Sequence, residues 1–479
     1  MGWDHGPAPA ARRRPGRAAG VVAVIGALVL VAVAGPPAVR ALTGGSALPL
    51  PVFAAQAPDP RAEGIRAALA QLTRGLRTRQ EATYLGAVDA RDAALVRRQR
   101  SVFRGLQALP LKDPELAWDG RRSRLPDVAG RYPPGALTVI ADLRYLLEGW
   151  DDESVADGVV LTLAPVSSRW VVVGDTEDAG GTGSRRFVEP WTTGSTLDVE
   201  RRPHVLVVGE TAHRSDVRRL ADHLEQVVAD VRARWPEPSW NGRVVAYAVT
   251  DDRFVQAWFG SQAARGPARG GAGGAATWEA RVGTLARGSA PDDPAAGPPR
   301  LVVTPYVLAR TDARAVSTLR HEVTHVATVR TGRPVAGWLA EGAAEFTGFR
   351  LGGARVDAAR TFAAHGLTAT AADQLRHGTW HPQLVVDRDA FYAGTSEAVS
   401  ALYLDGWIAA LYVADRYGDG VLRRLYDDAA SRPASASWDA VDAGALHAVL
   451  GTDHAGFTES VRRYGQALYR QVTGAGPGG

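Results

Sequence analysis

Apolar residues at helical spacing mark two consecutive helices in the second half of the chain. In the first segment they recur three or four positions apart, at Val316, Leu319, Val323 and Val326. This period predicts an amphipathic helix, and Thr311 and Asp312 are suited to cap its first turn. After a break at 332–334, a second helix is predicted from Val335 to about Gly353, because consecutive glycines favour a C-terminal stop.

Apolar runs around these helices predict a sheet before them and further helices after them. Strands are expected at 204–208, 242–250, 276–285 and 301–307, with a helix at 215–234. After about Val356 the predicted elements are helices: Glu397–Tyr417, Gly420–Ala430, Trp438–Leu450 and Phe457–Gln471, with Gly418 and Gly451 as stops. Residues 201–479 are therefore predicted to form an α+β domain, with a mixed sheet lobe followed by a helical lobe.

Residues 61–200 have a different pattern, in which helices come first and strands follow. Two helices are predicted at 65–76 and 89–109, and three strands at 137–147, 158–163 and 170–173. Helices followed by a curved antiparallel sheet resemble the nuclear-transport-factor-like cone fold. This resemblance implies a separate cone-like α+β domain. We find no catalytic constellation in it and interpret it as a spacer or a substrate-presenting module.

The first of the two central helices carries a metal-binding motif. His321 and His325 are four positions apart, so on a helix both imidazoles lie on one face and can reach the same metal ion. Glu322, beside the first histidine, can act on a water at that metal as a general base. With 11 histidines in 479 residues, this arrangement would occur by chance roughly 0.01 times. The motif therefore predicts a site for one zinc ion, Zn²⁺.

The second central helix adds two carboxylates on a common face. Glu341 and Glu345 are four positions apart. We interpret Glu341 as the third metal ligand, which leaves the fourth position for water. Glu345 would accept a ring N–H from a ligating histidine and so fix its tautomer. Alternatively, Glu345 is an exposed acid of the helix.

The two helices together resemble those of the gluzincin metallopeptidases, the group that contains thermolysin and the aminopeptidase N-type enzymes. The residues from Trp338 to Phe346 are most similar to the bacterial thermolysin-like, or peptidase MA-like, families. Downstream, Tyr403 and Gly406 match the Tyr-x-x-Gly helix of aminopeptidase N-type enzymes. The resemblance implies a zinc metallopeptidase of peptide or protein substrates, with Tyr403 stabilising the tetrahedral intermediate. It also implies that the strand at 276–285 is the sheet edge that pairs with extended substrate.

This resemblance covers less than half of the 479 residues and departs from the family pattern at two points. The gap from His325 to Glu341 is shorter than in thermolysin by about one helical turn. Asp405 replaces the lysine that is common in the aminopeptidase version. The first departure concerns the connecting loop, and the second removes support for aminopeptidase specificity.

Other interpretations of single residues remain open. His321 and His325 could be ordinary helix histidines, and Tyr403 could serve only in core packing. Tyr392 is a rival of Tyr403 for stabilising the oxyanion, and His365 is an alternative proton donor.

Two other function classes also remain open. One is a non-catalytic, zinc-binding protein of the cell surface in which residues 61–200 carry the binding function. The presence of the potential general base Glu322 argues against this class. The other is a zinc hydrolase of a non-peptide amide or a cell-wall bond.

His377 and His381 are expected on the surface, because glycine and proline follow them.

An apolar run near the N-terminus predicts an exported protein. Ala18–Ala34 has the lower limit of length for a membrane-spanning helix, and the arginines before it would stay in the cytoplasm. This predicts a single-pass protein of the cell membrane with its catalytic part outside. The same residues also fit a signal peptide cleaved after Ala32-Val33-Ala34, which would release a secreted protein. Residues 1–60 thus comprise a cytoplasmic tip, the membrane segment and a tether rich in proline, alanine and glycine.

Composition narrows the possible partners. The chain has no cysteine, so it offers neither disulfides nor thiolate ligands. Its net charge is only +4, and basic and acidic residues are interspersed along the sequence. Nucleic-acid binding is not expected, because no basic stripe with interleaved aromatic residues is present. The expected partners are a peptide or protein substrate and, through the N-terminal helix, a membrane.

Overall fold

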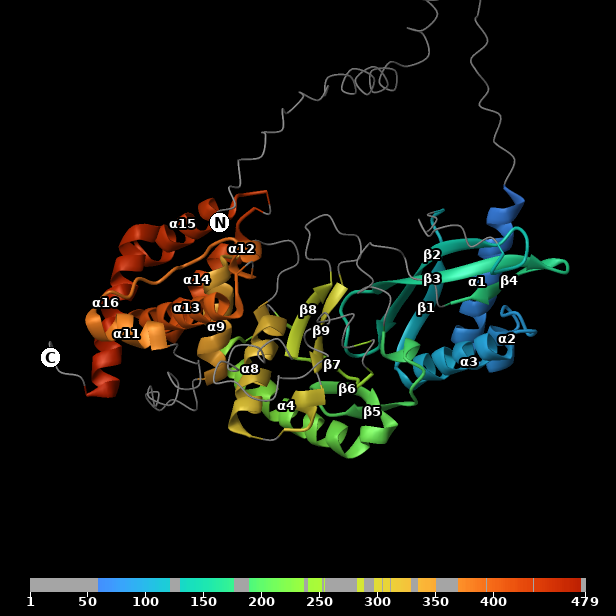
Figure 1. Cartoon of the computed structure of the whole chain (residues 1–479), viewed down its shortest axis with the longest axis horizontal. Coiled ribbons are helices and arrows are strands. Elements are labelled where there is room, and N and C mark those ends of the chain that lie inside the picture. Colours follow the sequence, from blue (N-terminus) through green and yellow to red (C-terminus); the bar gives the residue numbers. More distant parts are fainter. Residues whose placement is uncertain are drawn as a thin grey trace, which may run out of the picture. The chain divides into compact units, whose positions relative to one another are not determined.

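The structure describes most of the chain after residue 58. It is a computed structural model in which residues 59–474 are described except 121–129, 176–188, 237–239, 252–253, 255–281, 288–296, 304, 311, 329–334, 350–368, 393 and 434. The predicted membrane segment Ala18–Ala34 and the alternative proton donor His365 lie outside the described residues, as does the first part of the strand predicted at 276–285. Over the described residues the fold is mixed α+β, as predicted (Figure 1).

The first part of the chain folds into three helices and a four-stranded antiparallel sheet. The helices are α1 (Pro60–Thr78), α2 (Glu81–Leu85) and α3 (Ala93–Ala108). The sheet has the order β1 (Leu111–Ala117), β2 (Leu137–Leu147), β3 (Val155–Val166) and β4 (Arg169–Gly174). The carboxylates of Asp59 and Asp92 cap α1 and α3. Both predicted helices and all three predicted strands are present, and α2 and β1 are additional.

Strand β1 is not predicted by the sequence pattern, and its geometry explains why. Pro114 lies inside the strand, and the register with β2 shifts between Lys112 and Glu115. Asp113 at this irregularity has a positive φ of 49°. The proline is tolerated because β1 is an edge strand, but the bulge removes the two-residue alternation by which a strand is recognised.

A second sheet of five strands follows, with three parallel strands at its centre. Its order is β5 (Leu197–Arg201), β6 (Val205–Glu210), β7 (Val244–Ala248), β9 (Gly297–Val303) and β8 (Val282–Arg287). Strands β6, β7 and β9 are parallel, whereas β5 and β8 run antiparallel to their neighbours. Helix α4 (Arg214–Arg234) makes the crossover from β6 to β7. Strand β8 is an edge strand, and β5 begins before the domain boundary predicted at residue 200.

The central strands of this sheet are buried on both faces, and different parts of the chain cover the two faces. Along β6, Val205 and Val207 belong to a core that includes α4 and the later helices. The alternate residues Leu206 and Val208 belong to a second core, which is shared with the N-terminal helices and the first sheet. The part of the chain predicted as a separate domain at 61–200 therefore covers one face of the second sheet.

A buried ion pair joins the two sheets within this shared core. Arg300 on β9 donates from Nη1 and Nη2 to the two carboxylate oxygens of Asp151, at 2.8 and 2.7 Å. The two side chains are only 1% and 0% exposed. Asp151 also accepts the backbone N–H of Leu147 at the end of β2. Burial raises the pKa of Glu189 well above its usual value despite the opposing effect of Arg300, so Asp151 is the main counter-charge of the arginine.

The helices after the sheet pack around one long apolar helix. They are α7 (Pro305–Leu308), α8 (Ala313–Thr328), α9 (Gly337–Phe349), α11 (Ala369–His377), α12 (Arg388–Tyr392), α13 (Ser396–Tyr417), α14 (Asp419–Ser431), α15 (Trp438–Leu450) and α16 (His454–Thr473). Among the described residues, α13 has the length and mean hydropathy (1.2) of a membrane-spanning helix, but 56% of that segment is buried inside the protein. Its apolar composition is explained by its central place among the orange and red helices of Figure 1.

Helices α9 and α13 approach each other through glycines. A Cβ atom on Gly342 would overlap the carbonyl of Gly406, and one on Gly406 would come within 2.8 Å of the carbonyl oxygen of Trp338. Because neither position has room for a side chain, the two helix backbones are in direct contact. This contact fixes Glu341 on α9 against the segment of α13 that carries Tyr403.

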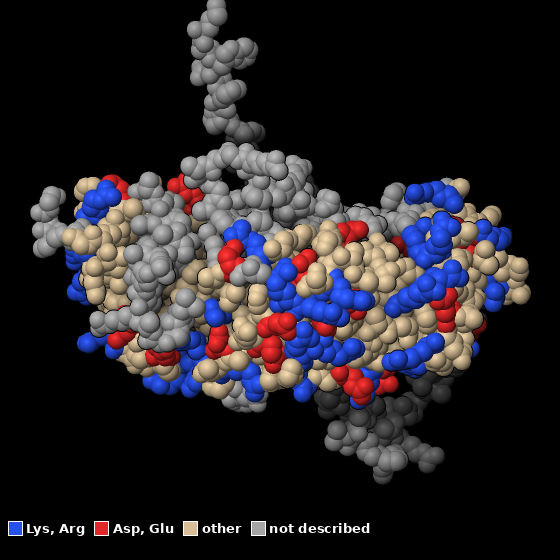
Figure 2. All heavy atoms as spheres, turned by 90° about the horizontal axis from the view of Figure 1, so that it is seen from below, with Lys and Arg blue, Asp and Glu red and all other residues tan. Residues whose placement is uncertain are grey.

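Charged side chains are mixed over the surface of the second sheet and α4. Arginines of this region pair with acids in three examples: Arg202 with Asp222, Arg214 with Asp198 and Arg218 with Glu200. Figure 2 shows basic and acidic side chains interspersed over the face that it presents. Each of these three arginines therefore has an acidic neighbour.

Replacing Asp151 by asparagine is expected to lower the free energy of unfolding by about 3–5 kcal/mol, because Arg300 would keep a buried charge without its counter-charge. Urea unfolding of the full-length protein, followed by tryptophan fluorescence, measures this change. The matched control is Asp152→Asn at the exposed neighbouring position, for which a loss below about 1 kcal/mol is expected. Equal free energies of unfolding of the two variants would show that the ion pair of Asp151 and Arg300 does not contribute to stability.

Candidate metal centre

Helix α8 buries one face and presents the two motif histidines on another. Leu319 and Val323 lie in the core that α8 shares with α4. The start of the helix is fixed by Asp312, whose carboxylate accepts the backbone N–H of Ala315 at 3.0 Å. Thr311, the other predicted capping residue, lies outside the described residues. The helical period predicted from the sequence thus sets which face of α8 the histidines occupy.

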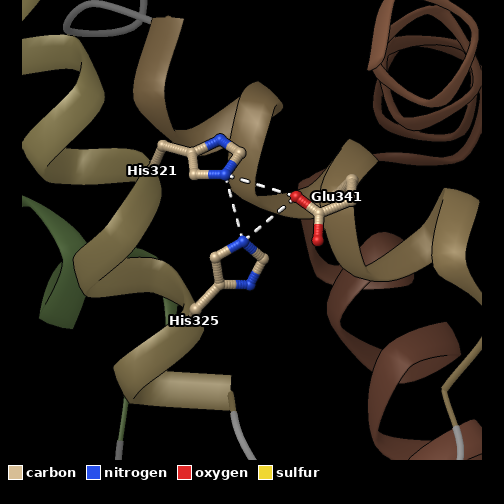
Figure 3. Close-up of side chains that lie close together, drawn as sticks. All are labelled: His321, His325 and Glu341. Carbon is tan, nitrogen blue, oxygen red and sulfur yellow. Dashed lines mark hydrogen bonds and ion pairs between the residues drawn. The ribbon is translucent and has the colours of Figure 1, made fainter. Parts of the chain in front are cut away.

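His321 and His325 converge with Glu341 of α9 on a small triangle of ligand atoms (Figure 3). The two Nε2 atoms are 3.0 Å apart, and Oε2 of Glu341 lies 3.3 Å from Nε2 of His321 and 3.2 Å from Nε2 of His325. Ligand atoms of a tetrahedral zinc ion with bonds of about 2.0–2.1 Å are about 3.3–3.4 Å apart. The three atoms therefore have nearly the spacing of one face of such a tetrahedron. This buried group could hold a metal ion.

The two carboxylates of α9 lie in the interior. Glu341 and Glu345 are 1% and 2% exposed, so the alternative of an exposed acid at Glu345 does not hold. Oε1 of Glu345 lies 2.8 Å from Nδ1 of His321, the ring nitrogen that does not take part in the ligand triangle. The geometry at Nδ1 is that of a contact ion pair and not of an aligned hydrogen bond. Glu345 is nevertheless at the place where a carboxylate can fix the histidine tautomer.

Acidic side chains dominate the electrostatics around His321. Burial alone lowers the pKa of this imidazole, but Glu345, Glu341 and Glu322 outweigh it and hold the pKa well above its usual value. Burial raises the pKa of Glu341, but His325 and His321 reverse this and hold it well below its usual value. Glu322 is itself 7% exposed, beside His321 on α8. A cation that binds at this site replaces protons as the source of positive charge.

Two tyrosines border the ligand triangle. Tyr392, at the end of α12, donates its hydroxyl to Oε1 of Glu341 at 2.5 Å. Tyr403 on α13 has its ring 6.0 Å from that of His321 and 5.4 Å from that of Phe391. The sequence favours Tyr403, but the hydrogen bond to the predicted ligand comes from Tyr392. No local pattern reveals that bond, because 51 residues separate its partners.

His377 and His381 are not part of this group. His377 ends α11, is exposed, and has Nδ1 at 3.3 Å from Oδ1 of Asp373 one turn earlier. His381 is also exposed. Within the described residues neither belongs to a group that could hold a metal ion, in keeping with the predicted surface position.

Asp405, which stands where the aminopeptidase pattern has a lysine, is a buried acid that holds a loop. Its Oδ1 accepts the indole N–H of Trp380 at 3.2 Å, and its Oδ2 accepts the backbone N–H of Gln383 at 2.7 Å. Burial raises the pKa of Asp405 to about 7, against the opposing effect of these two donors. The loop between α11 and α12 is thereby attached to α13.

Helix α9 is also attached to the last two helices. The indole N–H of Trp338, one turn before Glu341, donates to Oδ1 of Asp442 on α15 at 2.8 Å. Oδ2 of Asp442 lies 2.6 Å from Nδ1 of His454 on α16, and this contact raises the pKa of His454. The helix that carries Glu341 is thus fixed at its start by polar contacts.

Comparisons with models of protein families, with curated proteins and with solved structures found no match for the chain. The resemblance to gluzincins is therefore carried by the motif residues themselves. The function has to be inferred from those residues and from the geometry in which the fold holds them.

Replacing His325 by alanine is expected to abolish metal binding, because it removes one of the three predicted protein ligands and leaves two. Elemental analysis of the full-length protein should find about one zinc ion per chain in the wild type and almost none in the variant. His377→Ala, an exposed histidine outside the group, is the control and should retain the metal. Equal zinc contents in wild type and His325→Ala would contradict the assignment.

The buried Asp405 predicts a pH-dependent loss of stability. Its pKa is about 7 in the folded protein and about 4 in the unfolded chain. Because the folded state favours the protonated acid, its stability falls as pH rises from about 4 to 7, by on the order of 4 kcal/mol for this group. Asparagine does not titrate, so the variant Asp405→Asn lacks this pH dependence. The free energy of unfolding of the variant minus that of the wild type should therefore be larger at pH 8 than at pH 4.5.

Urea midpoints of both proteins at pH 4.5, 6 and 8 test this expectation. Asp373→Asn, at a position 60% exposed, is the matched control without a pH-dependent gain. A difference between wild type and Asp405→Asn that stays constant with pH would refute the raised pKa.

Proposed function

We propose that the protein is a zinc-dependent metallopeptidase of the gluzincin type. The observation that carries this proposal is the triangle formed by the Nε2 atoms of His321 and His325 and Oε2 of Glu341, with side lengths of 3.0 to 3.3 Å. Two nitrogen ligands and one oxygen ligand at this spacing suit zinc and leave a fourth position open, as in catalytic zinc sites. The absence of cysteine excludes the thiolate sets of most structural zinc sites.

The protein residues around this site have separate roles in the proposed reaction. A bound zinc ion would polarise the scissile carbonyl and acidify water. Glu322 takes the proton from the attacking water and delivers it to the leaving amine. Tyr403 donates a hydrogen bond to the developing oxyanion. Glu345 holds the ring of His321 through Nδ1, so that Nε2 is presented to the metal.

The wider chain fits a peptidase that works outside the cytoplasm. We propose a two-lobed, thermolysin-like arrangement in which the five-stranded sheet and the helices from α11 onward flank the site. Edge strand β8, antiparallel to β9, would bind an extended peptide through its backbone. The segment Ala18–Ala34 would anchor the chain in the cell membrane or direct its secretion.

Replacing Glu322 by glutamine is expected to leave zinc content unchanged and to lower kcat by about 10²–10⁴-fold, because the amide cannot accept the proton from water. Hydrolysis of casein and of a mixed peptide library by the zinc-loaded, full-length protein measures the change. Glu397→Gln, at an exposed acid in the first turn of α13, is the control and should keep wild-type activity.

The outcomes separate the possible functions. Full activity of Glu322→Gln would refute the general-base role. A wild-type protein that binds zinc but cleaves no peptide would point to a hydrolase of a different amide bond, or to a zinc-binding protein without catalysis.

A further inference from the structure

The two carboxylate oxygens of Glu341 have different partners. Oε2 faces the two histidine Nε2 atoms at 3.2 and 3.3 Å. Oε1 accepts the hydroxyl of Tyr392 at 2.5 Å, a distance typical of a charge-assisted O–H···O⁻ bond. Given the proposed zinc site, we propose that Tyr392 is a positioning residue that holds Glu341 so that only Oε2 is offered to the metal. The carboxylate then binds through one oxygen, and the fourth metal position stays open.

The segment that carries Tyr392 is attached to the helix that carries Glu341. The carbonyl oxygens of Val385 and Val386 accept the backbone N–H groups of Trp338 and Gly337, at 2.9 and 2.8 Å. These are first-turn donors of α9, which have no partner within their own helix. The loop before α12 therefore caps α9, and the two cannot shift independently.

The same segment is attached to α13 on its other side. Asp405 accepts the backbone N–H of Gln383 and the indole N–H of Trp380. Phe391, beside Tyr392, is 0% exposed and packs edge-on against the ring of Tyr403. With its neighbour buried and its loop bonded on two sides, the Tyr392 ring has a fixed approach to Glu341 even though it is 47% exposed itself.

This arrangement bears on the denticity of the ligand. Glu341 is 1% exposed, so an oxygen that neither the metal nor a donor engages would be buried without a partner. A hydroxyl bonded to Oε1 supplies that partner and draws the oxygen away from the metal. Without the hydroxyl, the carboxylate would be less restrained from rotating toward the metal, and Oε1 would then fill the position that water needs.

The test compares Tyr392→Phe with the wild type, both as full-length chains stripped of metal. Zinc is titrated in competition with a chromophoric chelator, and Co²⁺ is used as a spectroscopic probe of coordination number. We expect zinc affinity to fall by about 10–100-fold in the variant. We also expect weaker visible absorption of its cobalt form, as four-coordination gives way to five-coordination. Tyr417→Phe, at a tyrosine that is 43% exposed at the far end of α13, should match the wild type in both measurements.

The outcomes distinguish this proposal from the one beneath it. Unchanged zinc affinity and an unchanged cobalt spectrum in Tyr392→Phe would overturn the positioning role and leave the zinc site standing. No zinc binding by the wild type would overturn both. A lower melting temperature of the metal-free variant, in proportion to its loss of affinity, would also overturn the proposal, since the tyrosine would then act on the fold and not on Glu341.

Discussion

The central parallel strands are apolar on both faces, so other elements must pack on each face of the sheet. This requirement determines how the rest of the chain is arranged. In β6 every residue from Val205 to Glu210 is buried, and successive side chains enter opposite cores. Helices α4, α8 and α9 contribute to one core, and the N-terminal helices and their antiparallel sheet contribute to the other. Helix α8 therefore packs against a sheet whose other face is covered by the first part of the chain. The part of the chain interpreted from its sequence as a spacer or a substrate-presenting module thus shares a core with the second sheet.

Several contacts hold α9, the helix that carries Glu341. Its start is capped by the loop before α12, its tryptophan is bonded to Asp442, and its middle touches α13 through Gly342 and Gly406. Each contact comes from a different element of the helical part of the fold. Metal sites function only when their ligands are held within a fraction of an ångström, and these contacts hold the backbone that carries Glu341.

The sequence predicts those parts of the site that depend on residues close together in the chain. The placement of His321, His325, Glu341 and Glu345 is local, because a helical period and a four-residue spacing determine which face each occupies. The same holds for the four C-terminal helices, which form close to their predicted bounds, with Gly418 and Gly451 as the C-caps of α13 and α15.

Features that depend on distant parts of the chain could not be predicted in this way. The bond from Tyr392 to Glu341 depends on the path of the loop before α12, and β1 is hidden by Pro114 and its bulge. Burial of β6 on both faces can be inferred from its continuous apolar run. The run does not indicate which segment of the chain packs on the second face. The ion pair of Asp151 and Arg300, which lies in that second core, joins residues that are 149 positions apart.

Closing a loop of this length costs chain entropy, and this cost arises before the contacts that offset it have formed. During synthesis, Asp151 therefore leaves the ribosome long before its partner exists, and the core beneath β9 can close only after some three hundred residues have been made.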